Sequence, residues 1–125
     1  MKIIILGAGQ VGRTLAENLA NDANDVTMVD QDAGYLKDLQ DRLDIRTVKG
    51  HACLPNILAS AGAEDADMLV AVTNSDEINM VACEIASHLF KISTRIARIR
   101  AAEYMGCEEL FHPGGIAVDV MISPE

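Results

Sequence analysis

The most restrictive feature of the sequence is an unbroken alternation of short apolar runs with segments of helical periodicity. The apolar runs predict six strands, at residues 2–6, 25–30, 45–49, 67–73, 94–100 and 116–120. The segments between them predict helices near residues 10–21, 32–43, 54–61, 75–90 and 101–110. Because strand–helix–strand crossovers are right-handed, the alternation predicts an α/β fold of the Rossmann type. The expected sheet is parallel, doubly wound and six-stranded, in the order 3-2-1-4-5-6, with helices on both faces.

Residues at the ends of two segments support the helix assignments. Asn74 is expected to cap the N-terminus of the helix near 75–90. Pro55 suits the first turn of the helix near 54–61, and Gly62 is expected just past its end.

The length and charge of the chain limit its function. Its 125 residues suffice for one domain, spanning 1–125, and leave no room for a separate catalytic domain. The formal net charge of -9 disfavours binding to nucleic acid. No apolar stretch reaches the length of about 18 residues that a membrane span needs, so direct membrane insertion is not expected.

The residues that bind metals are too scattered to suggest a metal site. Cys53, Cys83 and Cys107 lie outside any CxxC pair and are expected to be small buried apolar residues in a reducing compartment. His51 and Cys53 lie two residues apart, but two ligands with no others nearby do not predict a zinc site.

The strongest functional signal is a GxGxxG pattern directly after the first predicted strand, Gly7-Ala8-Gly9-Gln10-Val11-Gly12. Gly7 permits a tight turn, Gly9 lets a pyrophosphate approach the backbone, and Gly12 lets the helix pack closely on the strand. The following helix turns free N–H groups and its positive dipole end toward the phosphates. The pattern alone is weak, but its place between a strand and a helix favours a dinucleotide site.

Asp30 ends the second predicted strand, within the interval of about 20 residues after the glycines that dinucleotide-binding folds show. Its carboxylate can accept hydrogen bonds from both hydroxyls of an adenosine ribose, and it would repel a 2′-phosphate. NAD or NADH is therefore favoured over NADP. The structural alternative for Asp30 is a solvated carboxylate or a helix cap.

Further contacts are expected at the other strand ends, because ligands of open parallel sheets lie beyond the carboxyl ends of the strands. Gly50 allows close approach to an adenine, and His51 either stacks or hydrogen-bonds there or is merely exposed. Thr73 and Asn74 can bind a pyrophosphate, ribose or nicotinamide-side group, or can serve only as helix caps, the role favoured for Ser75.

Two arginines on the fifth predicted strand, Arg98 and Arg100, share one face of that strand. In an acidic domain they are the expected cationic partners of phosphates, with Arg98 the first choice. The alternative for Arg100 is pairing with surface carboxylates.

No arrangement of residues predicts catalysis, so the chain is expected not to be an enzyme. His88 lies within a helical pattern and His112 precedes Pro113 in a turn, while no serine or cysteine has the context of a nucleophile. Asp76 and Glu77 begin a helix, where carboxylates suit the dipole.

The last three residues, Ser123-Pro124-Glu125, look like the opening of a helix, with an N-cap candidate followed by a proline and a carboxylate. The chain is therefore expected to be a fragment of a longer protein.

Over essentially all of its length the sequence resembles the N-terminal domains of the TrkA/RCK family, which regulate potassium uptake and potassium conductance. The resemblance rests on MKIIILGAGQVG, DADMLVAVTNSDEINMVAC, RIARIR and the closing ISPE. It implies dinucleotide contacts at Gly7 to Val11, Asp30, Thr73, Asn74 and Arg98. It also implies a cytoplasmic protein, peripheral on the inner face of the cell membrane, that docks on a potassium transporter subunit. The helix beginning near Ser123 would pair such domains into homo-oligomers.

The leading hypothesis is therefore a regulatory module that binds NAD or NADH and adjusts potassium transport. ATP and ADP are conceivable competitors, although some relatives hold triphosphate with an arginine where this chain has Gln10. One alternative is the cofactor-binding half of an NAD-dependent dehydrogenase. Another is a structural interaction domain with a degenerate pocket.

Overall fold

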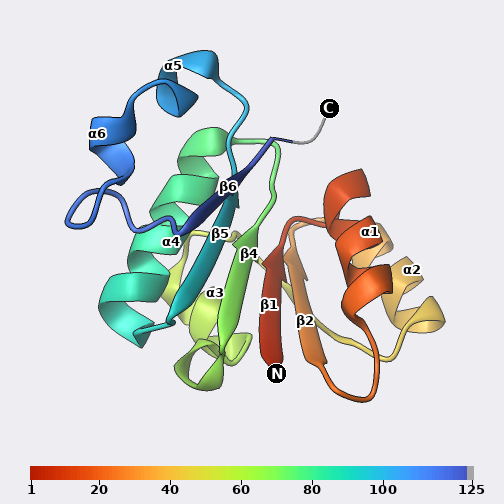
Figure 1. Cartoon of the computed structure of the whole chain (residues 1–125). Coiled ribbons are helices and arrows are strands. Elements are labelled where there is room, and N and C mark those ends of the chain that lie inside the picture. The colour runs from red at the N-terminus through yellow and green to blue at the C-terminus, as the bar shows by residue number, and fades with distance from the viewer. Residues whose placement is uncertain (124–125) are drawn as a thin grey trace.

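The computed structural model describes residues 1–123 and contains one six-stranded sheet in the order β3-β2-β1-β4-β5-β6 (Figure 1). All neighbouring strands run parallel. The strands are β1 (Lys2–Leu6), β2 (Asp25–Asp30), β3 (Arg46–Lys49), β4 (Met68–Ala71), β5 (Thr94–Arg98) and β6 (Val120–Ile122). The predicted fold class and strand order are confirmed.

Helices cover both faces of the sheet, as the sequence predicts. On one face lie α1 (Gln10–Leu19) and α2 (Ala33–Arg42), and on the other lie α3 (Pro55–Ser60) and α4 (Asp76–Phe90) (Figure 1). A short 3₁₀ helix, η1 (Ala63–Asp65), precedes β4.

The central strand β1 separates two apolar cores. Ile3 and Ile5 pack with α1 and α2, whereas Ile4 and Leu6 pack with α3 and α4, because side chains alternate along a strand. All four are at most 1% exposed. A strand covered on both faces has a continuous apolar sequence, and the run at residues 3–6 has that pattern.

The C-terminal third departs from the predicted elements. The predicted helix near 101–110 is two short helices, α5 (Ala102–Met105) and α6 (Glu108–Phe111), with Gly106 as the C-cap of the first. The last strand, predicted near 116–120, is present but lies further along the chain, since β6 begins only at Val120. Residues 112–119 form irregular backbone around Gly114, whose φ of +95° lies in the left-handed region.

Two predicted helix ends and one predicted cap can be compared with the structure. Pro55 is in the first turn of α3, and Gly62 follows the end of that helix with a φ of +90°. Asn74 is not the cap of α4. Ser75 caps it instead, with its hydroxyl accepting a hydrogen bond from the Ile78 N–H at 3.2 Å.

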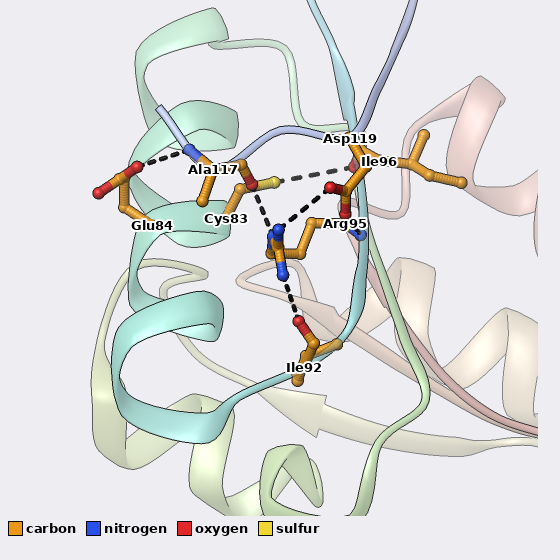
Figure 2. Close-up of polar contacts among 7 residues, drawn as sticks. All are labelled: Cys83, Glu84, Ile92, Arg95, Ile96, Ala117 and Asp119. Carbon is orange, nitrogen blue, oxygen red and sulfur yellow. Dashed lines mark hydrogen bonds and ion pairs between the residues drawn. The ribbon is translucent and has the colours of Figure 1, made fainter. Parts of the chain in front are cut away.

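A polar network around Arg95 attaches the irregular segment to the rest of the fold (Figure 2). The guanidinium donates to the carbonyl of Ala117 at 2.8 Å and to the carboxylate of Asp119 at 3.1 Å. The carboxylate of Glu84, on α4, accepts from the N–H of Ala117 at 2.6 Å. These contacts join residues far apart in the sequence and hold residues 117–119 in place directly before β6, at the edge of the sheet.

The three cysteines are free thiols, and they differ in burial. Cys83 is fully buried, and burial raises the pKa of its thiol to about 12. Cys53 and Cys107 are only half-buried, so the prediction of three buried cysteines is correct for Cys83 alone.

Among residues 1–123, none of the helices combines the length and apolarity that crossing a bilayer requires. The helix predicted to begin near Ser123 lies outside the described part of the chain, which ends at that residue.

Candidate nucleotide-binding site

A cavity of about 580 Å³ lies beyond the carboxyl ends of β1, β2, β4 and β5. This volume is within the range of about 300–1,000 Å³ typical of small-molecule sites. Eight of the predicted site residues line it: Gly7, Gly9, Val11, Asp30, His51, Thr73, Asn74 and Arg98. Segments far apart in the sequence therefore meet at the topological switch point of the sheet, where β1 and β4 are neighbours.

Gly7 and Gly12 are required by the backbone of the protein itself. Gly7 has a φ of +107°, and a Cβ there would lie 2.9 Å from backbone atoms of Thr73. A Cβ on Gly12 would collide with the carbonyl oxygen of Gly7. The two glycines thus bring α1 close to the end of β1, the role that the sequence predicts for Gly12.

Gly9 is different, because no contact within residues 1–123 requires a glycine there. Its φ of -71° suits any residue, and a Cβ would find no atom within 4 Å. Gly9 lines the cavity and is the N-cap residue of α1, where no side chain caps the helix. The first-turn N–H groups of a helix lack intrahelical partners, so this end of the cavity offers free donors and positive potential.

Asp30 is held in one orientation by two backbone donors. One carboxylate oxygen accepts from the N–H of Ala8 and the other from the N–H of Asp32, both at 2.7 Å. A carboxylate has about four lone-pair sites, so each oxygen can still accept from a ligand hydroxyl. The bond to Ala8 sets the distance between the glycine turn and the Asp30 carboxylate.

Arg98 is the cation at the cavity. Its Nε is buried without a hydrogen-bond partner, and no ion pair engages its guanidinium within residues 1–123. A buried donor without a partner is costly, so this atom is suited to an anion entering the cavity.

Arg100 does not share a strand face with Arg98, because β5 ends at Arg98. The backbone N–H of Arg100 instead donates to Asp76 at 3.0 Å. Arg100 lines a smaller adjacent hollow with Asp76 and Glu77. The predicted strand at 94–100, with both arginines on one of its faces, is therefore wrong in its C-terminal end.

Four predicted contact residues are absent from the cavity lining: Ala8, Gln10, Gly12 and Gly50. A Cβ on Gly50 would collide with the side chain of Ile57, so helix packing explains that glycine. His51 does line the cavity, and its Nδ1 accepts from the N–H of Cys53 at 3.1 Å. Nucleotide contacts from all twelve predicted residues, those that line the cavity included, stay predictions.

Seven residues that line the cavity were not predicted as contacts, and neither was the supporting residue Asn79. Asp32 and Tyr35 line the cavity beside Asp30, and the guanidinium of Arg13 lies 5.0 Å from the centre of the Tyr35 ring. Asn79, in α4, is completely buried and hydrogen-bonds to Thr73 and to the backbone of Arg98. A polar residue on the buried face of a predicted helix was the available sequence signal for Asn79.

The remaining histidines lie outside the cavity. His88 pairs with Glu84 at 3.0 Å on the surface of α4, and the ring of His112 lies 2.7 Å from the carbonyl of Pro113. Within the described residues no three His, Cys, Asp or Glu side chains gather as a metal site would require.

The family model for the TrkA-N domain matches residues 3–124. The chain belongs to the TrkA-N domain family. This TrkA-N domain is 58% identical over 125 residues to the Trk system potassium uptake protein TrkA of Halomonas elongata. It is 60% identical over 126 residues to the protein of the same name from Vibrio alginolyticus. Each match covers the whole chain but only 27% and 28% of those relatives, so the domain spans little more than a quarter of their length.

Solved structures have the same fold as this TrkA-N domain. The TrkA-N domain of the inner membrane protein ybaL from Escherichia coli aligns with a TM-score of 0.83 and 19% identity, covering 98% of this chain and 86% of that one. The GsuK channel bound to NAD aligns with a TM-score of 0.78 and 19% identity, covering 97% of this chain and 21% of that one. At these identities the likeness concerns the fold.

Proposed function

We propose that this TrkA-N domain binds NAD or NADH and, as a regulatory module, adjusts the activity of a potassium-uptake system. The observation that carries the proposal is the space beside Gly9, at the uncapped end of α1, where a Cβ would find no atom within 4 Å. Close relatives are named as potassium uptake proteins, and a structural neighbour is a channel bound to NAD. ATP and ADP would share the adenosine and phosphate contacts and so compete.

The residues of the cavity suit the parts of a dinucleotide in order. The carboxylate of Asp30 would accept from the adenosine ribose, the α1 N-terminus beside Gly9 would hold the diphosphate, and Arg98 would neutralise it. The bound nucleotide would act as a ligand and not as a reactant. Its oxidised and reduced forms differ in shape and charge, and the domain would respond to that difference.

Preference for NAD over NADP would come from two carboxylates. Asp30 and Asp32 both line the cavity, and the N–H of Asp32 holds Asp30 in place. A 2′-phosphate on the adenosine ribose would face both charges.

Regulation requires that the nucleotide bind two arrangements of the whole protein with different affinity, since equal affinity shifts no equilibrium. We propose that these arrangements differ in how the domain pairs with copies of itself, through the helix beginning near Ser123. The partner would be a membrane potassium transporter subunit, which would place the domain on the cytoplasmic face of the membrane.

Titration of the domain with NAD, NADH, NADP and ATP by calorimetry tests the proposal. NAD and NADH are expected to bind, and NADP to bind at least about tenfold more weakly because of charge repulsion near Asp30. Asp30→Asn should reduce this discrimination, while Asp38→Asn, in the exposed middle of α2, serves as the charge-matched control. Absence of NAD and NADH binding would refute the proposal and favour a structural interaction domain. Hydride transfer by the full-length protein would favour a dehydrogenase instead.

A further inference from the structure

Asn79 is one of two polar residues that are fully buried within residues 1–123; the other is Thr27. It lies in the first turns of α4 among apolar neighbours, where an amide without hydrogen bonds would cost free energy. Buried polar groups are retained where their bonds are satisfied, so the partners of Asn79 indicate what it does.

The Asn79 amide joins the ends of two strands just where their pairing stops. The last register pair between β4 and β5 is Ala71 with Ala97. Beyond it, the Asn79 Nδ2 donates to the Thr73 carbonyl at 3.2 Å and to the Arg98 carbonyl at 2.8 Å. Asn79 thus replaces the missing sheet bonds and fixes two residues that line the cavity.

The oxygen end of the Asn79 amide determines which hydrogen bond the Thr73 hydroxyl donates. The Asn79 Oδ1 accepts from the Thr73 N–H at 3.0 Å and lies 2.7 Å from the Thr73 Oγ1. Because an N–H can only donate and a carbonyl can only accept, these contacts fix which end of the amide is oxygen. Two acceptors lie near the Thr73 hydroxyl proton, the Asn79 Oδ1 at 2.7 Å and the Ser75 carbonyl at 3.2 Å. Because the Asn79 Oδ1 can only accept and is the closer of the two, the hydroxyl donates its proton to Asn79. The hydroxyl oxygen accepts from the Ser75 N–H at 3.2 Å. One lone pair is left for a ligand.

We propose that Asn79 is a positioning residue for nucleotide binding, which makes Thr73 a hydrogen-bond acceptor toward the ligand and holds the backbone of Arg98. Thr73 then recognises a donor, such as a hydroxyl of the second ribose, rather than a phosphate oxygen. The inference rests on the proposed function, since it assigns roles within the same cavity. It divides the site into an adenosine end at Asp30 and a donor-recognising end at Thr73.

The test compares NAD with AMP, which carries the adenosine and one phosphate but no second ribose. Thr73→Val is expected to weaken NAD binding about tenfold, the effect of one lost hydrogen bond, and to leave AMP within about twofold. Thr73→Ser keeps the hydroxyl and should keep NAD affinity within about twofold. Asn79→Ala should reproduce the loss for NAD, and the double variant with Thr73→Val should be no weaker than Asn79→Ala alone, because the two residues act as one unit.

Cys83→Ala is the matched control, because Cys83 lies one turn further along the buried face of α4, hydrogen-bonds to the carbonyl of Ile96 and is not among the residues that line the cavity. It should lower the melting temperature without changing the ratio of NAD to AMP affinity. Equal weakening of NAD and AMP in the Asn79 variant, or undiminished NAD binding by Thr73→Val, would overturn the proposal. If Asn79→Ala fails to fold, the comparison of Thr73→Val with Thr73→Ser tests the proposal by itself. A wild-type chain that binds neither probe would instead refute the proposed function.

Discussion

The contrast between Gly9 and Gly12 yields a prediction that separates binding from folding. Both glycines belong to the same turn and both are replaced by alanine, so the chemical change is identical. The surroundings differ, because a Cβ on Gly12 would collide with the carbonyl of Gly7, whereas a Cβ on Gly9 would find no atom within 4 Å.

The expected magnitudes follow from these surroundings. Gly12→Ala forces α1 away from β1, and overpacking of this kind costs about 1–3 kcal/mol or more. In a domain of this size each kcal/mol lowers the melting temperature by roughly 3–6 °C. Gly9→Ala should change the free energy of unfolding by less than about 1 kcal/mol, because two effects oppose each other. Alanine makes the unfolded chain less flexible, which stabilises the fold, but it is a poorer N-cap residue than glycine, which destabilises α1.

Binding should respond in the opposite way. A methyl group at Gly9 would occupy space that we assign to the diphosphate and would displace at least one charge-assisted hydrogen bond, worth about 1.5–3 kcal/mol. The affinity for NAD should therefore fall by roughly 10- to 150-fold. Thermal unfolding without ligand and calorimetric titration with NAD measure the two effects on the same samples.

A folded Gly9→Ala variant that binds NAD as tightly as the wild type would refute the reasoning. It would mean that no ligand group approaches the turn at this position. A large loss of stability in Gly9→Ala would equally contradict the interpretation of the space beside it as ligand space.

Three further predictions concern single residues. Thr27→Val should raise the free energy of unfolding by about 1 kcal/mol in denaturant titrations, because the buried Thr27 hydroxyl has no partner; a decrease would contradict this. Arg98→Ala should weaken NAD binding about tenfold and reduce the salt dependence of the affinity, because Arg98 lines the cavity and would pair with the phosphates. Arg100→Ala should bind NAD with the wild-type affinity, because Arg100 lines the smaller hollow. Equal losses of affinity in the two variants would contradict the assignment of Arg98 as the phosphate partner. Burial raises the pKa of Cys83 from 9.0 to about 12, so the native state holds this proton longer than the unfolded state. The stability that results is present below pH 9 and is lost as the pH rises toward 12. Cys83→Ala should therefore make the free energy of unfolding fall less steeply over this pH range. An equally steep fall in the variant would show that the Cys83 thiol does not cause it.

Most of the fold was predictable because its signals are local. The buried strand β1, the glycine turn and Asp30 follow one another within the first crossover, and crossover handedness then dictates how they meet. Thr73 and Arg98 were predictable as residues that line the cavity, because each follows or ends a strand whose apolar pattern is local.

The errors arose where structure depends on contacts between distant residues. Arg95 and Asp119 are 24 residues apart, and their bonds, rather than any apolar pattern, determine where β6 begins. The packing role of Gly50 was also not predicted, because Ile57, whose side chain a Cβ at Gly50 would meet, lies on α3.

By itself the sequence determined the class of fold, the order of the strands and the place of the glycine turn, since periodicity and glycine conformation act over a few residues. Only the tertiary structure decided which side chains meet at the cavity and which of their polar atoms donate or accept hydrogen bonds. The bond from Asn79 to the carbonyl of Arg98 spans 19 residues and follows no periodicity. Hydrogen-bond direction depends on every partner present, and those partners come together only when the sheet and α4 have packed.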